Sequence, residues 1–166
     1  MYRKGTSLNL YSLPAPLVFI LFLAYNHFMT IINEKFVINT QGFTDIIDIT
    51  KNVQNAVYRH SLQDASVLIY VAGSTVSVTN IEFEPGVLVD LEEALDKIAP
   101  TGVEYHHDAT WHDGNGYAHV RAAIVGNSTT IPLIEGALQL GTWQQIVLVD
   151  FDNRPRNRTV YVQIIH

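Results

Sequence analysis

The spacing of hydrophobic and polar positions along the chain predicts an α+β domain, in which partly grouped strands accompany two helices. Helical spacing covers 50–59, with Thr50 or Asp48 as the N-cap, and 87–98, which ends before Pro100. The segment 105–116 has no hydrophobic period and is rich in Asp, Gly and Asn, so we expect a loop there. Apolar, β-branched or alternating runs predict about seven strands, at 35–40, 66–71, 75–83, 117–125, 129–133, 145–151 and 159–165.

Length, charge and residue usage narrow the class of protein. The 166 residues fit one domain, which at this length buries roughly two thirds of its unfolded surface. The formal net charge of −6 argues against a general nucleic-acid binder, because such a protein needs a basic face. The chain has no cysteine, which excludes disulfides, thiolate zinc sites and a cysteine nucleophile. We therefore expect a globular, cytoplasmic protein.

The first 28 residues differ from the rest. Arg3 and Lys4 precede an apolar run at 17–25, a pattern of about the length of a signal peptide. The run is too short to span a bilayer comfortably, and no small-x-small cleavage site follows it. Three interpretations stay open: an upstream extension that is not translated, a signal or anchor, or a packed helix. We assign 1–28 to an apolar extension and 29–166 to the folded domain, and expect membrane association only if the extension is retained.

Four of the seven histidines fall between positions 106 and 119. His119 lies on the expected strand 117–125, where it shares a face with Arg121 and points away from the apolar face. Together with His107 from the preceding loop, it can bind a metal ion or form an acid–base pair. The alternative is that His119 is a hydrogen-bonded histidine of the sheet. We interpret His106 and His112 as structural or solvated.

Two glycine-containing segments can line a ligand pocket. Asn115 lies between Gly114 and Gly116, a pattern that suits either a pocket wall or a plain turn. In the segment 141–144, Thr142 and Gln144 can present hydrogen-bond donors, while Trp143 either borders the same pocket or fills the core.

Charged residues suggest where a phosphorylated compound can bind. Arg154, Arg156 and Arg158 alternate along an extended segment, so their guanidinium groups can bind phosphate from one face. The alternative is a charged sheet edge that prevents aggregation. Glu82, which alternates with Asn80 and Glu84, can carry Mg²⁺ for a diphosphate, or can simply be solvated. The chain has no P-loop, dinucleotide fingerprint or nucleophile elbow.

The order of these motifs resembles that of the YjbQ family, small α+β proteins named secondary thiamine-phosphate synthases. The resemblance covers about residues 30–166. The motifs that carry it are Tyr105-x-His107-Asp108, Asp113-Gly114-Asn115-Gly116, Ala118-His119, Gly126, Pro132, Gly136-x-Leu138-x-Leu140-Gly141-Thr142-Trp143-Gln144 and Arg156-x-Arg158.

The resemblance implies a compact trimer of domains with a largely antiparallel sheet or sandwich, and sites near subunit boundaries. It implies a reaction in which the thiazole phosphate nitrogen attacks hydroxymethylpyrimidine diphosphate, releasing pyrophosphate and forming thiamine phosphate. The expected partner is thus a small phosphorylated metabolite, with a divalent metal, Mg²⁺ or Zn²⁺, as a possible cofactor. On this chain the roles fall to His107, His119 and Glu82 for catalysis, to His107 and His119 for a metal, and to Asn115, Thr142, Gln144, Arg156 and Arg158 for substrate.

One position departs from the family pattern. The family commonly has His-Thr-Thr/Ser-Ala nine residues before the glutamate that matches Glu82, and this chain has Gly73-Ser74-Thr75-Val76 there. A site that needs three histidines therefore retains only His107 and His119 from the pattern. This departure leaves open an alternative function, a non-catalytic trimer that binds a metal ion or an anionic metabolite.

Overall fold

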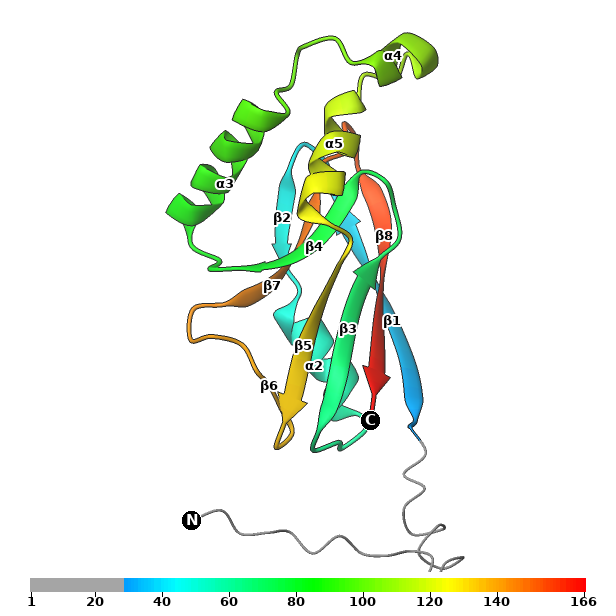
Figure 1. Cartoon of the computed structure of the whole chain (residues 1–166), viewed down its shortest axis with the longest axis vertical. Helices are drawn as coiled ribbons and strands as arrows, with labels where there is room; N and C mark the ends of the chain where they lie inside the picture. Colours follow the sequence, from blue (N-terminus) through cyan, green and yellow to red (C-terminus); the bar gives the residue numbers. More distant parts are fainter. Residues whose placement is uncertain (1–28) are drawn as a thin grey trace, which may run out of the picture.

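The computed structural model describes residues 29–166, so our interpretation of residues 1–28 lies outside the described part (Figure 1). The described chain forms two antiparallel sheets and four helices, which confirms the α+β class. The elements are β1 (Ile31–Thr40), β2 (Asp45–Asp48), α2 (Thr50–Tyr58), β3 (Ala65–Val71), β4 (Val76–Ile81), α3 (Pro85–Ile98), α4 (His106–Trp111), α5 (Gly116–Val125), β5 (Ser128–Ile134), β6 (Ala137–Leu138), β7 (Gln145–Asp150) and β8 (Arg156–Ile165).

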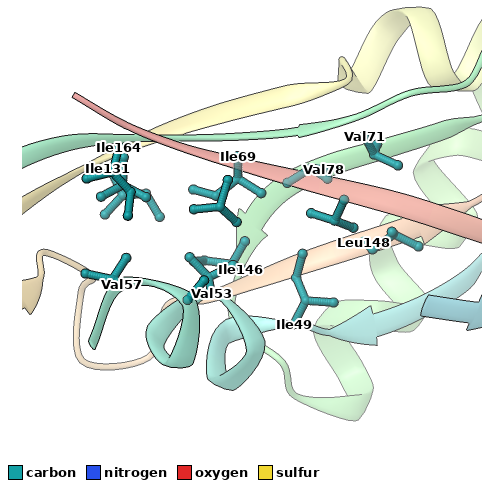
Figure 2. Close-up of a cluster of buried hydrophobic side chains, with 14 of the residues drawn as sticks. Ile49, Val53, Val57, Ile69, Val71, Val78, Ile131, Ile146, Leu148 and Ile164 are labelled. Atoms are coloured by element: carbon teal, nitrogen blue, oxygen red, sulfur yellow. The ribbon is translucent and has the colours of Figure 1, made fainter. Parts of the chain in front are cut away.

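The larger sheet has the strand order β1-β8-β3-β5-β6. β8 pairs with β1 along ten residues, from Arg156 opposite Thr40 to Ile165 opposite Ile31. Buried and more exposed residues alternate along β3 and β8, as expected of strands with one face toward a core. The inward face packs against α2 and the smaller sheet, and Figure 2 shows Val53 on α2 and Ile146 on β7 among these side chains.

The smaller sheet, β2-β7-β4, lies between two hydrophobic cores. Its central strand β7 is buried from Ile146 to Asp150. Ile146 and Leu148 belong to the core shared with the larger sheet, whereas Val147 and Val149 pack with residues of α3 and α5. Because both faces of β7 are covered, its sequence is a continuous apolar run, as in a doubly covered strand.

The prediction of a strand at 117–125 is wrong, because these residues form helix α5 (Gly116–Val125). Tyr117, Ala118, Arg121 and Ala122 are its buried side chains, a spacing of one face of a helix. Alanine also favours helix over strand. His119 and Arg121 consequently do not share a face: Arg121 is buried and donates to Ala99 O, Thr44 Oγ1 and Asp96.

Other local expectations also change. The expected loop 105–116 contains helix α4, and β2 and β6 add to the predicted strands. Position 49, not Thr50 or Asp48, is the N-cap of α2, although the Asp48 carboxylate accepts a hydrogen bond from Thr50 N. The helix at 87–98 and the remaining strands are confirmed with shifted ends. Within residues 29–166, no helix is long and apolar enough to cross a membrane.

Candidate functional site

The helices α4 and α5 bring His107 and His119 together. Their ring centroids lie 4.3 Å apart, with the rings tilted by 44°. The turn between the helices is fixed by Asp108, whose carboxylate accepts a hydrogen bond from Gly116 N at 3.0 Å. Gly116 cannot carry a side chain, since a Cβ there would lie 2.4 Å from Tyr105 Cβ. The two sequence-predicted histidines are therefore adjacent, whereas His106 and His112 are exposed.

The two imidazoles have different surroundings. The pKa of His119 is lowered from its ordinary value of 6.5 by burial and by the neighbouring His107, against the carboxylates of Asp113, Asp152 and Asp108. His119 is therefore neutral at pH 7. His107 Nε2 lies 3.5 Å from Asp113 Oδ1, an ion-pair distance, but it is buried and has no hydrogen-bond partner within residues 29–166. A pair with one neutral ring can pass a proton.

Asn115 precedes α5 and is buried, with 6% of its surface exposed. Its Nδ2 lies 3.5 Å from Asp152 Oδ1, the outer limit of a hydrogen bond. Its Oδ1 is buried and has no partner among the described residues. The candidate site thus contains an acceptor that the folded domain itself does not use.

Asp150 and Asp152, which the sequence analysis missed, bind two of the three predicted arginines. Arg158 donates to Asp150 from Nε at 2.7 Å and from Nη2 at 2.6 Å. Arg156 donates from Nε to Asp152 Oδ2 at 2.6 Å. Arg154 is exposed and lies before β8. Two guanidinium groups are thereby matched by two buried carboxylates, a pairing that the Asp-x-Asp pattern ahead of the arginines could have suggested.

Threonines from distant parts of the chain complete this network. Thr40 donates to Asp150 Oδ2 at 2.5 Å, and Thr75 donates to Asp152 Oδ2 at 3.2 Å. Burial alone would raise the pKa of Asp152, but hydrogen bonds from Arg156 and from Asn153 N, and the charge of Arg156, outweigh burial and lower it. Asp152 is therefore an ionised carboxylate that only accepts hydrogen bonds.

Gly73, the position of the missing family histidine, lies beside this network. A Cβ there would lie 3.0 Å from Arg158 Nη1 and 2.8 Å from Val76 Cγ1. The φ of Gly73 is +155°, a value that L-residues with side chains rarely adopt. The backbone in this chain is thus shaped for glycine.

Glu82, Thr142 and Gln144 lie elsewhere. They border a shallow cavity of about 300 Å³ together with Gly141 and Trp143. β4 pairs with β7 from Val76 opposite Asp150 to Ile81 opposite Gln145, so Glu82 follows the end of β4 remote from the ion pairs. At about 3.3 Å per residue, the two ends lie roughly 15–20 Å apart. Within one chain, the structure does not bring Glu82 to the histidine pair.

The surroundings of Glu82 answer two further questions from the sequence. Trp143 is 70% exposed, so it does not fill the core. Glu84 caps α3, accepting a hydrogen bond from Val87 N at 3.0 Å, and the backbone N–H groups of Gly86 and Val87 lower its pKa. Asn80 donates to Thr129 Oγ1. Of these three residues, Glu82 is the exposed carboxylate that makes no hydrogen bond or ion pair within residues 29–166.

The His107–His119 pair and Glu82 differ in how well they fit a metal ion. Residues 29–166 contain no group of three or more His, Asp or Glu side chains placed to hold a metal ion. A catalytic zinc normally has three protein ligands, so the His107–His119 pair alone does not fit zinc. Magnesium is commonly held by one or two carboxylates together with substrate phosphates, a role that exposed Glu82 fits.

The fold and the site define a small α+β protein with paired histidines beside a buried carboxylate–arginine network. The chain belongs to the family described as "UPF0047 protein YjbQ-like", whose model matches residues 34–166. This finding confirms the resemblance seen in the sequence.

Relatives and solved structures agree with this assignment. A UPF0047 protein of Archaeoglobus fulgidus is 38% identical over 128 residues, covering 77% of this chain and 97% of its own. The UPF0047 protein YugU of Bacillus subtilis is 32% identical, with 77% and 95% covered. The crystal structure of a "YbjQ-like protein of unknown function" from Sulfolobus solfataricus superimposes with a TM-score of 0.78 at 28% identity, covering 82% of this chain and 98% of its own. The names of these three proteins specify no reaction.

Proposed function

We propose that this protein is a thiamine-phosphate synthase-type transferase, which joins hydroxymethylpyrimidine diphosphate to thiazole phosphate. The lone pair of the thiazole nitrogen forms the new C–N bond while the C–O bond to the diphosphate breaks, and its electrons leave with pyrophosphate. The observation that carries the proposal is the adjacent pair of His107 and His119, 4.3 Å apart, with one imidazole nitrogen buried and unpaired within the described residues.

In this reaction the histidine pair manages one proton. The attacking thiazole nitrogen carries no proton, so no base is needed on that side. His119, which its lowered pKa keeps neutral, can return a proton from solvent to His107 after the leaving pyrophosphate has taken one. His107, which faces the Asp113 carboxylate, is the ring placed to donate a proton to the leaving pyrophosphate. Positioned proton transfer of this kind contributes about 10²–10⁴-fold to a rate.

The remaining predicted residues bind substrate. Arg156, a third exposed beside Asp152, keeps N–H groups for a phosphate. Arg158 is almost completely engaged by Asp150 and Thr75, so its role is to hold the network in place and to offer Nη1 beside Gly73. Thr142 and Gln144 offer hydrogen bonds to a substrate in the cavity beside Glu82.

A divalent metal ion, when bound, screens the charge of the diphosphate, and Glu82 is the residue that would hold Mg²⁺.

We also propose that the protein is a cytoplasmic homotrimer with sites at the subunit boundaries. The support is the separation of the two groups of predicted residues within one chain, at opposite ends of β4. A boundary between subunits can place the cavity of one chain opposite the histidine pair of another. An isolated chain holds only half of each such site.

A second function is favoured by one observation, the glycine at position 73. Since this chain has glycine where the family pattern has a third histidine, a catalytic group of that pattern is missing, and a trimer that binds a metal ion or an anionic metabolite without catalysis is the alternative.

The test is thiamine phosphate formation by the purified full chain with Mg²⁺ and both heterocyclic substrates. Measurements on His107→Ala and His119→Ala are made beside His106→Ala and His112→Ala, whose side chains are exposed. We expect both site variants to lose turnover by about 100-fold or more and both controls to keep it. Absence of turnover in the parent protein, or equal rates in all variants, would favour the binding protein.

A further inference from the structure

A cavity of about 460 Å³ lies between α3 and α5, beside the candidate site but outside it. The residues of its border that matter most are Phe43, Glu92, Asp96, Tyr117, Arg121 and Asn153. None of them has a role in the proposed reaction. The volume falls within the range of about 300–1,000 Å³ that is usual for small-molecule sites. The cavity is therefore large enough for a small ligand.

The positive charge of Arg121 does not make this cavity a receptor for anions. The Arg121 side chain is 3% exposed and forms an ion pair with Asp96. Each of its three nitrogens already donates a hydrogen bond, Nε to Ala99 O, Nη1 to Thr44 Oγ1 and Nη2 to Asp96. Together, Arg121 and Asp96 add no net charge to the cavity.

Glu92 leaves the cavity with a negative charge that is not compensated. It precedes Asp96 by four residues on α3, so the two carboxylates share one face of the helix, where like charges repel each other. Glu92 is exposed and makes no hydrogen bond or ion pair within residues 29–166. A positive charge placed between the two carboxylates would remove the repulsion.

Tyr117 is an independent sign of a ligand. The residue is 7% exposed, yet its hydroxyl makes no hydrogen bond with any described residue, although the hydroxyl of a buried tyrosine usually has a partner. The hydroxyl is not among the fully enclosed atoms that lack a partner, so it opens into the cavity that Tyr117 borders. Burial raises the pKa of Tyr117, and the hydroxyl therefore stays protonated at pH 7.

The other walls favour an organic cation over a metal ion. Residues 29–166 provide no group of three or more His, Asp or Glu side chains that could hold a metal ion. Phe43, which is 67% exposed, presents an aromatic ring at the border, and aromatic faces attract ammonium groups. Asn153 donates from Nδ2 to Asp113 O at 2.6 Å, which leaves its amide oxygen as an acceptor. Carboxylates, an amide oxygen and a hydroxyl suit the three donors of a primary ammonium.

We propose that this cavity binds a small organic cation, a primary ammonium carried on an apolar body. The ammonium lies between Glu92 and Asp96, within reach of the Tyr117 hydroxyl, and the apolar body packs against Phe43. The inference rests on the residues of the cavity and not on the proposed function, so the loss of either leaves the other standing.

The test compares three probes of similar shape at pH 7: 2-phenylethylamine, which is a cation, 2-phenylethanol, which is neutral, and phenylacetate, which is an anion. Each is titrated into the full chain and followed by the NMR shifts of backbone amides. We expect the amine to shift the amides of Thr44 and Gly114, which border the cavity, and to bind at least about fivefold more tightly than the alcohol. Phenylacetate should bind most weakly. Equal or tighter binding of the alcohol or the acid, or no saturable shift at these amides, overturns the proposal.

Two variants test the assigned contacts. Glu92→Gln should weaken binding of the amine by about fivefold and leave the alcohol unaffected, whereas Glu93→Gln, an exposed neighbour on α3 that does not border the cavity, should bind both as the parent does. Tyr117→Phe, which removes only the hydroxyl, should weaken the amine by about two- to tenfold. Equal affinity of the two glutamine variants for the amine contradicts the role of Glu92, and with it the proposal.

Discussion

The guanidinium of Arg158 donates to both carboxylate oxygens of Asp150, from Nε to Oδ2 at 2.7 Å and from Nη2 to Oδ1 at 2.6 Å. Asp150 is fully buried at the end of β7, and Arg158 lies on β8 in the other sheet. The pair therefore joins the two sheets at the end of the molecule that carries the candidate site. Such a pair is costly to break, because the remaining charge would be buried without a partner.

We expect Arg158→Leu to lower the free energy of unfolding by about 3–5 kcal/mol, since Asp150 would keep a buried and uncompensated charge. The double variant Asp150→Leu with Arg158→Leu should recover a large part of that loss. Urea denaturation measures both effects. Arg154→Leu, at an exposed position, is the control and should change stability by no more than about 0.5 kcal/mol. A single variant as stable as this control would show that the pair does not support the fold.

Gly73→Ala should destabilise the protein more than Gly102→Ala. Both glycines have positive φ, +155° and +78°, but a Cβ at Gly102 would meet nothing within 4 Å, whereas one at Gly73 would lie 2.8 Å from Val76 Cγ1. We expect about 1 kcal/mol for Gly102→Ala from backbone strain and about 1–3 kcal/mol more for Gly73→Ala from overpacking.

The same comparison decides whether the family histidine can be restored. Gly73→His should destabilise at least as much as Gly73→Ala in thermal denaturation, since the larger side chain meets the same atoms. Equal melting temperatures for Gly73→Ala and Gly102→Ala would mean that Val76 and Arg158 move aside easily, and that position 73 can accept a side chain.

His119 should titrate below its ordinary pKa of 6.5, because burial and His107 disfavour its charged form. The unfolded chain then binds a proton at higher pH than the folded chain does. The contribution of His119 to the free energy of unfolding is therefore complete above the ordinary value and is lost as the pH falls toward the lowered one. NMR of the histidine ring nitrogens across this pH range measures the pKa directly.

Two variants assign the cause of this shift. His107→Ala should raise the pKa of His119, because both the neighbouring ring and part of the burial are removed. His106→Ala, at the adjacent exposed position, should leave it unchanged. A parent His119 that titrates at or above the ordinary value would contradict the neutral role assigned to it.

Trp143→Ala should leave stability within about 0.5 kcal/mol of the parent, because the side chain is 70% exposed. If the cavity beside Glu82 binds a heterocycle, loss of stacking should weaken substrate affinity by about tenfold. Tyr58→Ala, on α2 and also exposed, serves as the control in the same chemical denaturation and binding experiments. A large loss of stability in Trp143→Ala would place this tryptophan in the fold and not in a site.

Most of the fold could be predicted where burial gives a clear period. The strand at 66–71 and the helix at 87–98 correspond to β3 and α3 because one face of each packs on a core. The segment 117–125 was ambiguous, since alternating small and larger residues suit a strand while the buried set Tyr117, Ala118, Arg121 and Ala122 suits a helix. Only the packing against α3 and β4 separates these two possibilities.

The candidate site was predictable in part. His107 and His119 do lie together, but on two helices and not on a loop and a strand, so the face argument from a strand was wrong. The partners of Arg158 could not be predicted, because Thr75 and Asp150 come from chain segments whose pairing depends on the sheet topology. The separation of Glu82 from the histidines likewise follows from the register of β4 with β7.

The most direct test of the proposed transferase is subunit complementation between Glu82→Ala and His119→Ala. Each variant alone should be inactive, because each lacks one half of every site. Co-expressed and purified as mixed trimers, they should recover about one quarter of the parent turnover, since a random mixture leaves about that share of boundaries with both halves intact. A mixture as inactive as its parents would contradict a site shared between the histidine pair of one subunit and the Glu82 cavity of another.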